Sequence, residues 1–464
     1  MHELQKVIDG GYCIGCGACS YAGKNSIELV EDEYRRYQGR IKPESQDQDL
    51  DAALAVCPFS NHALNESEIS RRVFSHDDGS TDEVIGYNRS LYAGFVSEGD
   101  YRERCNSGGM ITWMLIQLLE KGIVDAVIHV KKSSRHGTLF EYGISKNCDD
   151  VLNSAKSRYY PVEISRVMET VRSIDGRYVF VGLPCFIKSV RNLAKIDSLI
   201  NDRIILYIGL VCGHLKSKTF ANLFAWQAGV PEGQLSDIDF RVKMEGRTAN
   251  AYGVKITDEN GEETLLQSKD CYGVSWGHNF FKYEACDYCD DVFAETADVV
   301  VGDAWLPGYV YDSKGNSIVV IRNEIFDNLI NSGMHSGQLA LDVLTAKEVR
   351  ESQAGGIRHR RGGLSYRLYL KKKRGSWVPD KRVDPENTKL SFGRKMIFRY
   401  RMHLRVLGYK AWDKAIESDD FKVFVRKTKL HLKIYDRMVR LNKKYESILF
   451  SKNLASDKDG VLKE

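Results

Sequence analysis

Three cysteines lie at three-residue steps near the start of the chain, at Cys13, Cys16 and Cys19. Steps this short let one tight loop place three thiolates around a small inorganic core, and Gly15 and Gly17 allow backbone amides to turn toward it. Zinc is the structural alternative, although zinc sites normally use paired C-x2-C knuckles. The run therefore favours one iron-sulfur cluster over zinc or inert thiols.

The fourth ligand of this cluster is expected from Cys57, which precedes Pro58 and follows the run after a 37-residue gap. Short apolar stretches at 26–30 and 36–41 in the gap predict strands. We therefore expect a small ferredoxin-type domain over residues 1–65 that binds one 4Fe-4S cluster through Cys13, Cys16, Cys19 and Cys57. The polar stretch at 65–86 is typical of a linker.

Strands and helices alternate between residues 87 and 322, a pattern that favours a mostly parallel sheet with covered faces. The apolar stretches predict strands at 91–96, 125–130, 177–182, 203–211 and 297–302. Helical periodicity predicts helices at 109–121 and 187–195. We therefore expect an α/β class, α+β over the whole chain, with a central α/β domain at 87–345 and a helical basic extension at 351–464.

Two cysteines directly follow predicted strands of this domain, Cys185 in Leu183-Pro-Cys and Cys212 in Cys-Gly-His. Ligands of parallel sheets bind beyond the carboxyl ends of strands, so neighbouring strands would bring both thiols to one centre. A C-x2-C pair, Cys286 and Cys289, precedes the strand at 297. We expect these four to hold a second iron-sulfur cluster; the alternatives are buried apolar cysteines or zinc. Three cysteines have no partner at useful spacing: Cys105, Cys148 and Cys271.

A turn with two glycines opens the helix predicted at 109–121, in Asn106-Ser107-Gly108-Gly109. Backbone N–H groups at a helix start bind anions, so this turn suits a phosphate-bearing cofactor, although an ordinary helix cap gives the same pattern. Asp303 and Trp305 follow another predicted strand, where a cofactor or a simple capped turn would fit equally.

Five ordered motifs resemble the beta-subunit family of coenzyme F420 hydrogenases and dehydrogenases across residues 87–345. The motifs are Asn106-Ser-Gly-Gly-Met-Ile-Thr112, Val181-Gly-Leu-Pro-Cys-Phe186, Gly209-Leu-Val-Cys-Gly-His214, Cys286-x2-Cys289 and Gly302-Asp-Ala-Trp305. The resemblance implies an iron-sulfur flavoprotein with a 4Fe-4S cluster on the four central cysteines. It also implies that FAD contacts Ser107, Gly108, Gly109 and Thr112 and lies near Asp303.

The expected function is an oxidoreductase that passes electrons between a ferredoxin-like donor and an organic substrate or coenzyme F420, through two 4Fe-4S clusters and FAD. His214 and Asp303 are candidate proton donors, and His214 could equally orient the backbone beside Cys212. Two alternatives stay open. One is an electron-transfer adaptor without its own substrate, which the resemblance also connects with polysaccharide biosynthesis; the other is a zinc-stabilised binding protein.

The net charge of +4 hides an uneven distribution, because residues 358–450 contain 27 Lys and Arg against 9 Asp and Glu. An amphipathic pattern accompanies this charge at Leu430, Ile434, Met438, Leu441, Tyr445 and Ile448. Residues 1–357, the acidic body, contain 37 Lys and Arg against 51 Asp and Glu. The basic segment could fold back on this acidic body, bind an acidic electron donor, or lie on an anionic membrane; no nucleic-acid motif accompanies it. Without a signal pattern or an eighteen-residue apolar run, we expect a cytoplasmic protein, with peripheral attachment to the inner face of the membrane as the alternative.

Overall fold

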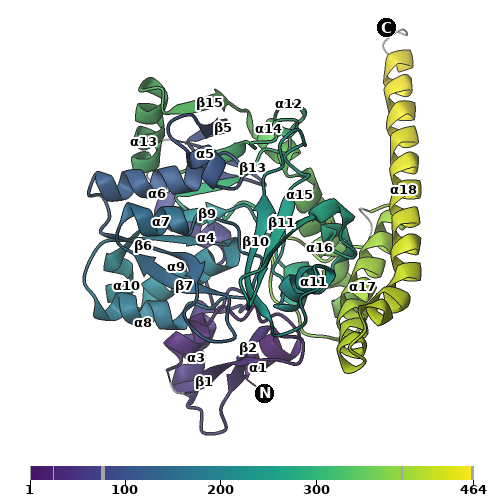
Figure 1. Cartoon of the computed structure of the whole chain (residues 1–464), viewed down its shortest axis with the longest axis horizontal. Helices are drawn as coiled ribbons and strands as arrows, with labels where there is room; N and C mark the ends of the chain where they lie inside the picture. The colour runs from purple at the N-terminus through teal and green to yellow at the C-terminus, as the bar shows by residue number, and fades with distance from the viewer. Residues whose placement is uncertain (1, 25, 75–78, 388–389, 461–464) are drawn as a thin grey trace.

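A computed structural model describes residues 2–24, 26–74, 79–387 and 390–460, with side chains described as far as residue 448. Figure 1 shows a small N-terminal module at one end of a body built on a central sheet, and a pair of long helices along one side. The mixed α/β architecture expected from the sequence is confirmed.

The N-terminal module combines three helices with a two-stranded antiparallel hairpin. Its elements are α1 (Glu3–Asp9), α2 (Ala18–Ala22), β1 (Ile27–Glu31), β2 (Tyr37–Ile41) and α3 (Asp47–Val56). The hairpin confirms both strands predicted between the cysteines. A small core of Leu4, Ile27, Leu50 and Leu54 holds these elements together, so the cysteine loop between α1 and α2 has a fixed support.

The segment at 65–86 is more structured than the predicted linker. It contains α4 (Glu66–Phe74), β3 (Ser80–Asp82) and β4 (Gly86–Asn88), while residues 75–78 lie outside the described part. Glu66 is buried and pairs with Lys188, with 3.2 Å between carboxylate oxygen and ammonium nitrogen. The linker prediction is wrong for α4 because this helix buries Glu66, Ile69 and Phe74 against the body, and Glu66 has a cationic partner there.

The central sheet has eight strands, and its middle is parallel. Their order is β15 (Leu339–Val343), β5 (Ser90–Val96), β14 (Ser317–Ile321), β13 (Val299–Asp303), β9 (Ile204–Leu210), β8 (Tyr178–Gly182), β6 (Ala126–Lys132) and β7 (Phe140–Ser145). β13, β9, β8 and β6 pair in parallel, whereas β14 and β7 run antiparallel to their neighbours. The continuous apolar stretches are strands buried on both faces.

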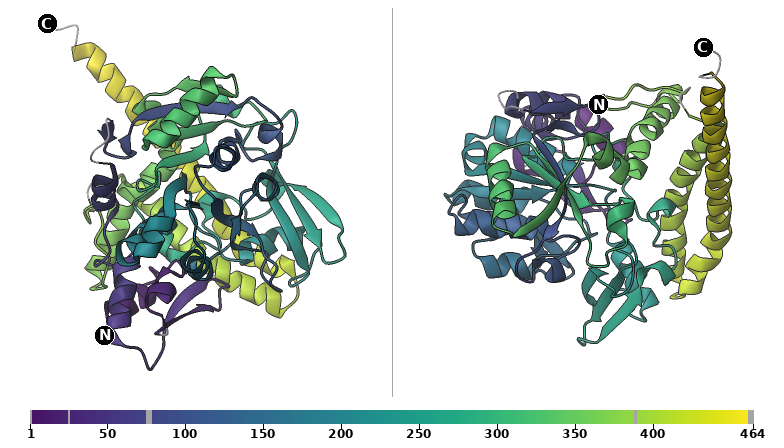
Figure 2. Two further views of the ribbon diagram at one scale, coloured as in Figure 1. Left: turned by 90° about the vertical axis from the view of Figure 1, so that its left-hand side faces the viewer. Right: turned by 90° about the horizontal axis from the view of Figure 1, so that it is seen from above.

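Helices cover both faces of this sheet, as Figures 1 and 2 show. One face packs on α6 (Met110–Glu120), α7 (Cys148–Asn153) and α13 (Glu324–His335), through Trp113 and Phe326 among others. The opposite face packs on α8 (Ser165–Ser173), α9 (Pro184–Ile196) and α10 (Ser198–Arg203). Adjacent sheet residues such as Val179 and Phe180 belong to different cores because side chains alternate along a strand.

Shorter elements surround the carboxyl ends of the parallel strands. A three-stranded antiparallel sheet combines β10 (Leu235–Val242), β11 (Gly253–Asp258) and β12 (Glu263–Gln267). The helical elements of this region are α5 (Tyr101–Arg104), α11 (Thr219–Gln227), α12 (Pro307–Val310) and the 3-10 turns η1 (Ser268–Asp270), η2 (Trp276–His278) and η3 (Glu284–Asp287).

The C-terminal extension is helical, as predicted, and contains α14 (Ala346–Ser352), α15 (Ala354–Arg360), α16 (Gly362–Lys373), α17 (Phe392–Glu417) and α18 (Phe421–Gly460). Residues 388–389 and 461–464 of it lie outside the described part. Part of its positive charge is internal, because Arg382 pairs with Asp290 and Glu295, and Arg405 pairs with Glu284. This part of the segment therefore folds back on the acidic body. Within the described residues, no helix is both long and apolar enough to cross a bilayer.

Candidate functional site

The four cysteines grouped by the sequence in the central domain line one cavity. This cavity lies at the carboxyl ends of β8 and β9, with about 260 Å³ of space between its lining atoms, part of it open to solvent. Its lining is Ile14, Phe59, Pro184, Cys185, Cys212, Leu215, Cys286, Cys289 and Arg360. The structure thus brings together thiols from three separate segments of the chain, and one arginine that the sequence did not indicate.

Strand pairing explains how Cys185 and Cys212 meet. β8 and β9 are parallel neighbours with Gly182 opposite Gly209, so the segments after both strands leave the same edge of the sheet. Cys185 is the second residue of α9, and Pro184 before it has the backbone angle that a helix start requires. The neighbouring arrangement on which the sequence prediction depended is therefore present.

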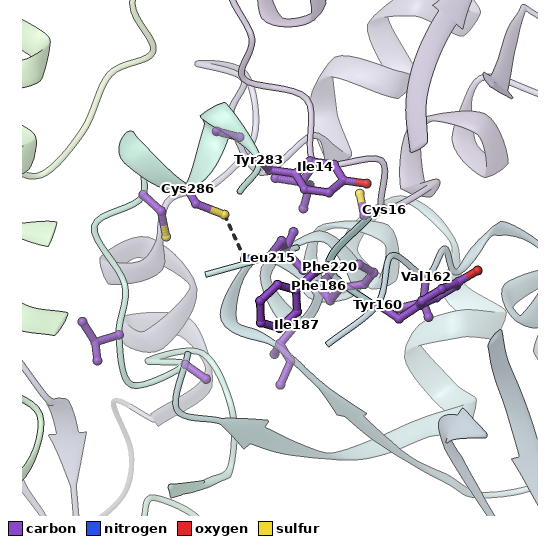
Figure 3. Packing of buried hydrophobic residues seen from close by; sticks show 14 of the residues in the cluster. Ile14, Cys16, Tyr160, Val162, Phe186, Ile187, Leu215, Phe220, Tyr283 and Cys286 are labelled. Carbon is purple, nitrogen blue, oxygen red and sulfur yellow. Dashed lines mark hydrogen bonds between the residues drawn. The ribbon is translucent and has the colours of Figure 1, made fainter. Parts of the chain in front are cut away.

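Cys286 and Cys289 are held by the turn η3 and the residues around it. The backbone N–H of Leu215 donates a hydrogen bond of 3.2 Å to Sγ of Cys286, drawn as a dashed line in Figure 3. Between the two cysteines, the buried carboxylate of Asp287 pairs with Lys282 and lies 3.8 Å from Arg367. These charges fix the C-x2-C turn against the body.

Arg360 supplies the positive charge in the cavity wall. Its guanidinium donates to Sγ of Cys289 at 2.7 Å, and to the backbone oxygens of Cys212 and Gly213 at 2.8 and 2.9 Å. The side chain is 2% exposed and comes from α15, in the C-terminal extension. One buried arginine therefore ties the extension to both sides of the cysteine cavity.

Burial raises the pKa of all four central thiols, and nearby thiols raise it further at Cys185 and Cys286. Burial raises the pKa of Cys185 well above its usual range, and the thiols of Cys212, Cys289 and Cys286 raise it further. For Cys212, burial again raises the pKa, but the Arg360 guanidinium opposes this effect. Such a set is stable as thiolates only when a positively charged group lies among them.

The N-terminal set, Cys13, Cys16, Cys19 and Cys57, is also brought together. Burial raises the pKa of Cys19 well above its usual range, and the other three thiols raise it further because they lie nearby. The backbone N–H groups of Gly15 and Gly39 each donate to Sγ of Cys13 at 3.4 Å. The donors that support this set are thus backbone amides, as a tight glycine-containing loop allows.

The two cysteine sets approach each other at Cys16 and Cys185. After burial and the central thiols, Cys16 is a further group that raises the pKa of Cys185. Ile14 and Phe59, from the two segments that carry the N-terminal cysteines, form part of the wall of the central cavity. Figure 3 shows Cys16 and Cys286 on either side of Ile14 and Leu215. Ile14 and Leu215 of the shared core lie between the two sets there, and the phenol of Tyr142 also lies near Cys16 and Cys185.

A second cavity, of about 290 Å³, lies beside the Ser-Gly-Gly turn. Its lining is Asn106, Ser107, Arg241, Lys243, Met244, Thr248, Ala249, Ala251, Tyr252, Ser313 and Gly315. Two cations, Arg241 and Lys243, face this space, and the ammonium of Lys243 also donates to the backbone oxygen of Ser107 at 2.8 Å. The polar and cationic lining suits an anionic part of a large cofactor.

The residues of the turn itself divide between this cavity and the interior. Ser107 lines the cavity in a left-handed conformation, with φ of 59°, and its hydroxyl donates to the backbone oxygen of Asn316 at 2.6 Å. Gly108 is packed so closely that a Cβ would collide with the backbone oxygen of Gly94. Gly109 caps α6, and the buried Thr112 contacts the thiol of Cys105 at 3.1 Å. Of the four, Ser107 is the one in the cavity wall.

Asp303, at the end of β13, forms a two-point ion pair with Arg241 of β10, at 2.8 and 2.9 Å. Burial opposes the charge of the guanidinium, but Asp303 more than offsets this and raises the pKa of Arg241. Asp303 therefore holds a permanently charged arginine at the wall of the second cavity.

His214 is buried against Trp276, with 4.4 Å between ring centroids, and its Nε2 has no hydrogen-bond partner among the described residues. Burial, with Lys216, Lys282 and Arg401 nearby, holds the pKa of His214 well below its usual range, so the imidazole is neutral. The ring centroids of Trp276 and Tyr159 are 5.0 Å apart. Burial raises the pKa of Tyr159, and the nearby Arg241 partly opposes this rise. Aromatic rings thus separate His214 from the pair of Asp303 and Arg241.

Sequence reasoning missed Arg360, Arg241 and Lys243. Arg360 belongs to the basic run that begins at Arg358, and the sequence does not distinguish a buried arginine from exposed arginines in this run. Arg241 lies in β10 and Lys243 directly follows this strand, two positions along the chain. Two cations at this spacing are too common to identify a site.

Two family models match the central part of the chain. The family model for the N-terminal part of the coenzyme F420 hydrogenase/dehydrogenase beta subunit matches residues 91–169, and the model for the C terminus of the same beta subunit matches residues 175–347. The coenzyme F420-dependent sulfite reductase of Methanocaldococcus jannaschii is 24% identical over 344 residues, which is 71% of this chain and 47% of that protein. This chain therefore spans about half the length of that relative.

Two further proteins are similar. The beta subunit of F420-dependent formate dehydrogenase 1 from Methanococcus maripaludis is 22% identical over 267 residues, 53% of this chain and 67% of the relative. A chain in a structure of the F420-reducing NiFe hydrogenase complex from Methanosarcina barkeri has 16% identity and a TM-score of 0.48, covering 67% of this chain and 100% of that chain. Together the two family models cover more than half of the sequence, and the chain belongs to the coenzyme F420 hydrogenase/dehydrogenase beta-subunit family.

Proposed function

We propose that the chain is an iron-sulfur flavoprotein oxidoreductase that passes electrons between a ferredoxin-like donor and an organic substrate or coenzyme F420. The observation that carries the proposal is the cavity whose wall contains Cys185, Cys212, Cys286 and Cys289. Membership of a family of redox subunits supports the same class of reaction.

The central thiols fit a cluster better than a single ion. A tetrahedral zinc ion needs its donors about 2.3 Å from one point. In the described part of the chain, no three Cys, His, Asp or Glu side chains are grouped so that they could hold one metal ion. A 4Fe-4S core binds its thiolates at separate corners, which suits four cysteines distributed around one cavity.

The N-terminal thiols fit a second 4Fe-4S cluster through Cys13, Cys16, Cys19 and Cys57. When bound, the clusters exchange single electrons and FAD exchanges one or two, which would join single-electron donors to a two-electron reduction. The protein's own part is to hold the thiols, to exclude water between the sets through Ile14 and Phe59, and to place one positive charge at Arg360.

The second cavity supports a site for the phosphate end of FAD. Arg241 and Lys243 would bind the anionic groups, and Asp303 orients the guanidinium of Arg241. Ser107 would contact the cofactor, while Gly108, Gly109 and Thr112 would act by shaping the turn. We retain Asp303 and the neutral imidazole of His214 as proposed proton-holding groups.

Anaerobic purification followed by an absorption spectrum and iron analysis tests the proposal. We expect flavin bands above a broad brown shoulder, with iron bound to the protein. A colourless protein loaded with zinc would contradict the redox function, and a shoulder without flavin would remove the flavin from it.

The assignment of the central set has its own test in Cys185→Ser. This change should remove about half of the protein-bound iron, because one of two four-iron clusters loses a ligand. Cys271→Ser is the matched control, since Cys271 is half-buried and outside both sets. Unchanged iron in Cys185→Ser would show that the central ligands are wrongly assigned.

An electron-transfer adaptor is the second candidate, because this chain spans about half of the F420-dependent sulfite reductase. Reduced F420, nicotinamide cofactors and reduced ferredoxin should each be mixed with the purified protein under anaerobic conditions. Multiple turnovers with one of these donors and an organic acceptor support an enzyme. Reduction of the clusters without turnover supports the adaptor.

A further inference from the structure

We propose that α18 is an interfacial helix that docks the protein on an anionic membrane surface. This inference does not depend on the proposed redox function. It rests on an exposed apolar stripe, on the charge beside that stripe, and on the position of the helix at the edge of the molecule.

The exposed stripe lies on one face of α18. Five apolar residues follow steps of three, four or seven, which place them on one side of a helix. They are Leu430 (65% exposed), Ile434 (39%), Leu441 (59%), Tyr445 (54%) and Ile448 (46%). Apolar residues exposed singly are ordinary, but five aligned over five turns form a continuous surface.

A different face of the same helix holds it to the protein. Phe424, Leu432 and Tyr435 are buried in the main core, and the hydroxyl of Tyr272 hydrogen-bonds that of Thr428 at 2.8 Å. Nearer the end, Glu446 pairs with Arg394 of α17. Packing within the chain therefore does not explain why apolar residues occupy the exposed stripe, and another contact has to account for them.

Positive charge accompanies the stripe. Between Phe421 and Gly460 the helix carries 11 Lys and Arg against 4 Asp and Glu, a net charge of +7. Arg437 and Lys444 fall at the edge of the stripe, and Lys433 and Arg440 follow beside them; all four are exposed. Long cationic side chains on the flank of an apolar face can reach lipid phosphates while the apolar residues enter the interface.

The same charges disfavour a second copy of this chain as the occupant. Two α18 helices paired along the stripe would bring Arg437 and Lys444 of one helix close to those of the other, with +7 on each side. An anionic bilayer is complementary to the net positive charge of the helix.

The place of α18 in the molecule permits this contact. Figures 1 and 2 show α17 and α18 side by side along one side of the body, with the last turns of α18 extending beyond it. A flat surface can therefore approach the helix from outside without meeting the sheet domain.

Sedimentation with lipid vesicles tests the proposal. The full-length protein should sediment with vesicles of phosphatidylglycerol and phosphatidylcholine but not with phosphatidylcholine alone, and added salt should weaken the binding. Leu441→Asp combined with Tyr445→Asp should weaken it by about tenfold or more, because apolar burial is lost and negative charge is added. Both positions are exposed, so the fold should be retained.

Val343→Asp is the matched control, because Val343 is 80% exposed on β15, away from α18. It should bind vesicles like the unmodified protein. Absence of binding to anionic vesicles, or equal binding by the double variant, would overturn the proposal. Light scattering supplies a second arm: a dimer that dissociates in the double variant would make a second copy the occupant and would also overturn it.

Discussion

In the N-terminal cysteine set, backbone N–H groups of Gly15 and Gly39 donate to the thiol of Cys13, whereas in the central set the guanidinium of Arg360 donates to Cys289. The first set is built mainly from one short loop, and backbone amides of this loop and of β2 face the sulfur of Cys13. The second is assembled from strand ends, a 3-10 turn and a distant helix, with a full positive charge in its wall. Backbone N–H groups and a buried cation both stabilise thiolates. The first need only a suitable loop conformation, whereas the second needs a particular side chain that the fold brings from a distant segment.

Loss of ligands gives the largest expected effect and shows whether the sets are independent. Cys16→Ser and Cys212→Ser should each remove about half of the iron, and the double variant nearly all of it. Low-temperature electron paramagnetic resonance of the reduced protein should then show a different remaining signal in each single variant. If either single change removed all the iron, the two sets would be one coupled unit and the comparison would be wrong.

Gly15→Ala tests the backbone-supported set. Gly15 has φ of 64°, and a Cβ there would collide with the backbone oxygen of Tyr37. We expect a loss of about 2 kcal/mol or more in the free energy of unfolding, with loss of the N-terminal iron. Chemical denaturation and iron analysis measure both.

Gly122→Ala separates strain from collision. Gly122 has nearly the same φ, 62°, but nothing lies within 4 Å of the added Cβ. It should cost about 1 kcal/mol from backbone strain alone and keep all the iron. Equal losses in both variants would mean that the close approach to Tyr37 has no special importance.

The difference between the sets also explains what the sequence could predict. The grouping of Cys13, Cys16 and Cys19 follows from spacing, because a loop of seven residues determines its own geometry, whereas Cys57 joins them only through the fold of the N-terminal module. The central ligands depended on β8 and β9 being neighbours, which alternation of strands and helices suggests but cannot establish. Arg360 was not predictable, since only the fold brings α15 to the strand ends, and its neighbours Arg358 and Arg361 have the same chemistry in the sequence.

Charge in the C-terminal region shows the same limit. The sequence predicted a basic helical extension, and the helices are present. Which cations are internal depends on the acidic partners that the fold supplies, such as Glu295 for Arg382. The Ser-Gly-Gly turn was found from its sequence pattern. Glycine is required at position 108 because the backbone oxygen of Gly94 leaves no room for a Cβ, and this contact cannot be inferred from the local sequence.

Arg360→Gln tests the side-chain-supported set. Removing the positive charge should shift the midpoint potential of the central cluster to more negative values and leave the N-terminal cluster unchanged, because a nearby cation favours the reduced, more negative state. Arg360→Lys retains the positive charge but loses the hydrogen bonds to Cys212 and Gly213, so its midpoint potential should lie between those of the unmodified protein and Arg360→Gln. Potentiometric titration of each cluster's resonance signal measures the shift.

The control for Arg360 is Arg358→Gln, on the same helix but exposed. It should leave both potentials unchanged because solvent screens its charge. A shift of both clusters in Arg360→Gln would mean a general change of structure instead of a local effect on the central set.

Lys243 extends the comparison to the second cavity, whose wall also contains cationic side chains. A change at Lys243 should give the smallest of these effects, a change in the affinity for FAD. Burial and the charge of Arg102 lower the pKa of Lys243 to about 8. The ammonium is therefore charged below pH 8 and loses its charge as the pH rises through this value, so binding of FAD should weaken between pH 7 and pH 9, by about threefold to tenfold. Lys243→Arg keeps its charge over this range and should bind with constant affinity, measured by flavin fluorescence. A site that binds its ligand through backbone N–H groups, as proposed for the N-terminal set, would bind with an affinity that does not change between pH 7 and pH 9. Equal pH profiles for the unmodified protein and Lys243→Arg would therefore mean that Lys243 does not hold FAD in the second cavity.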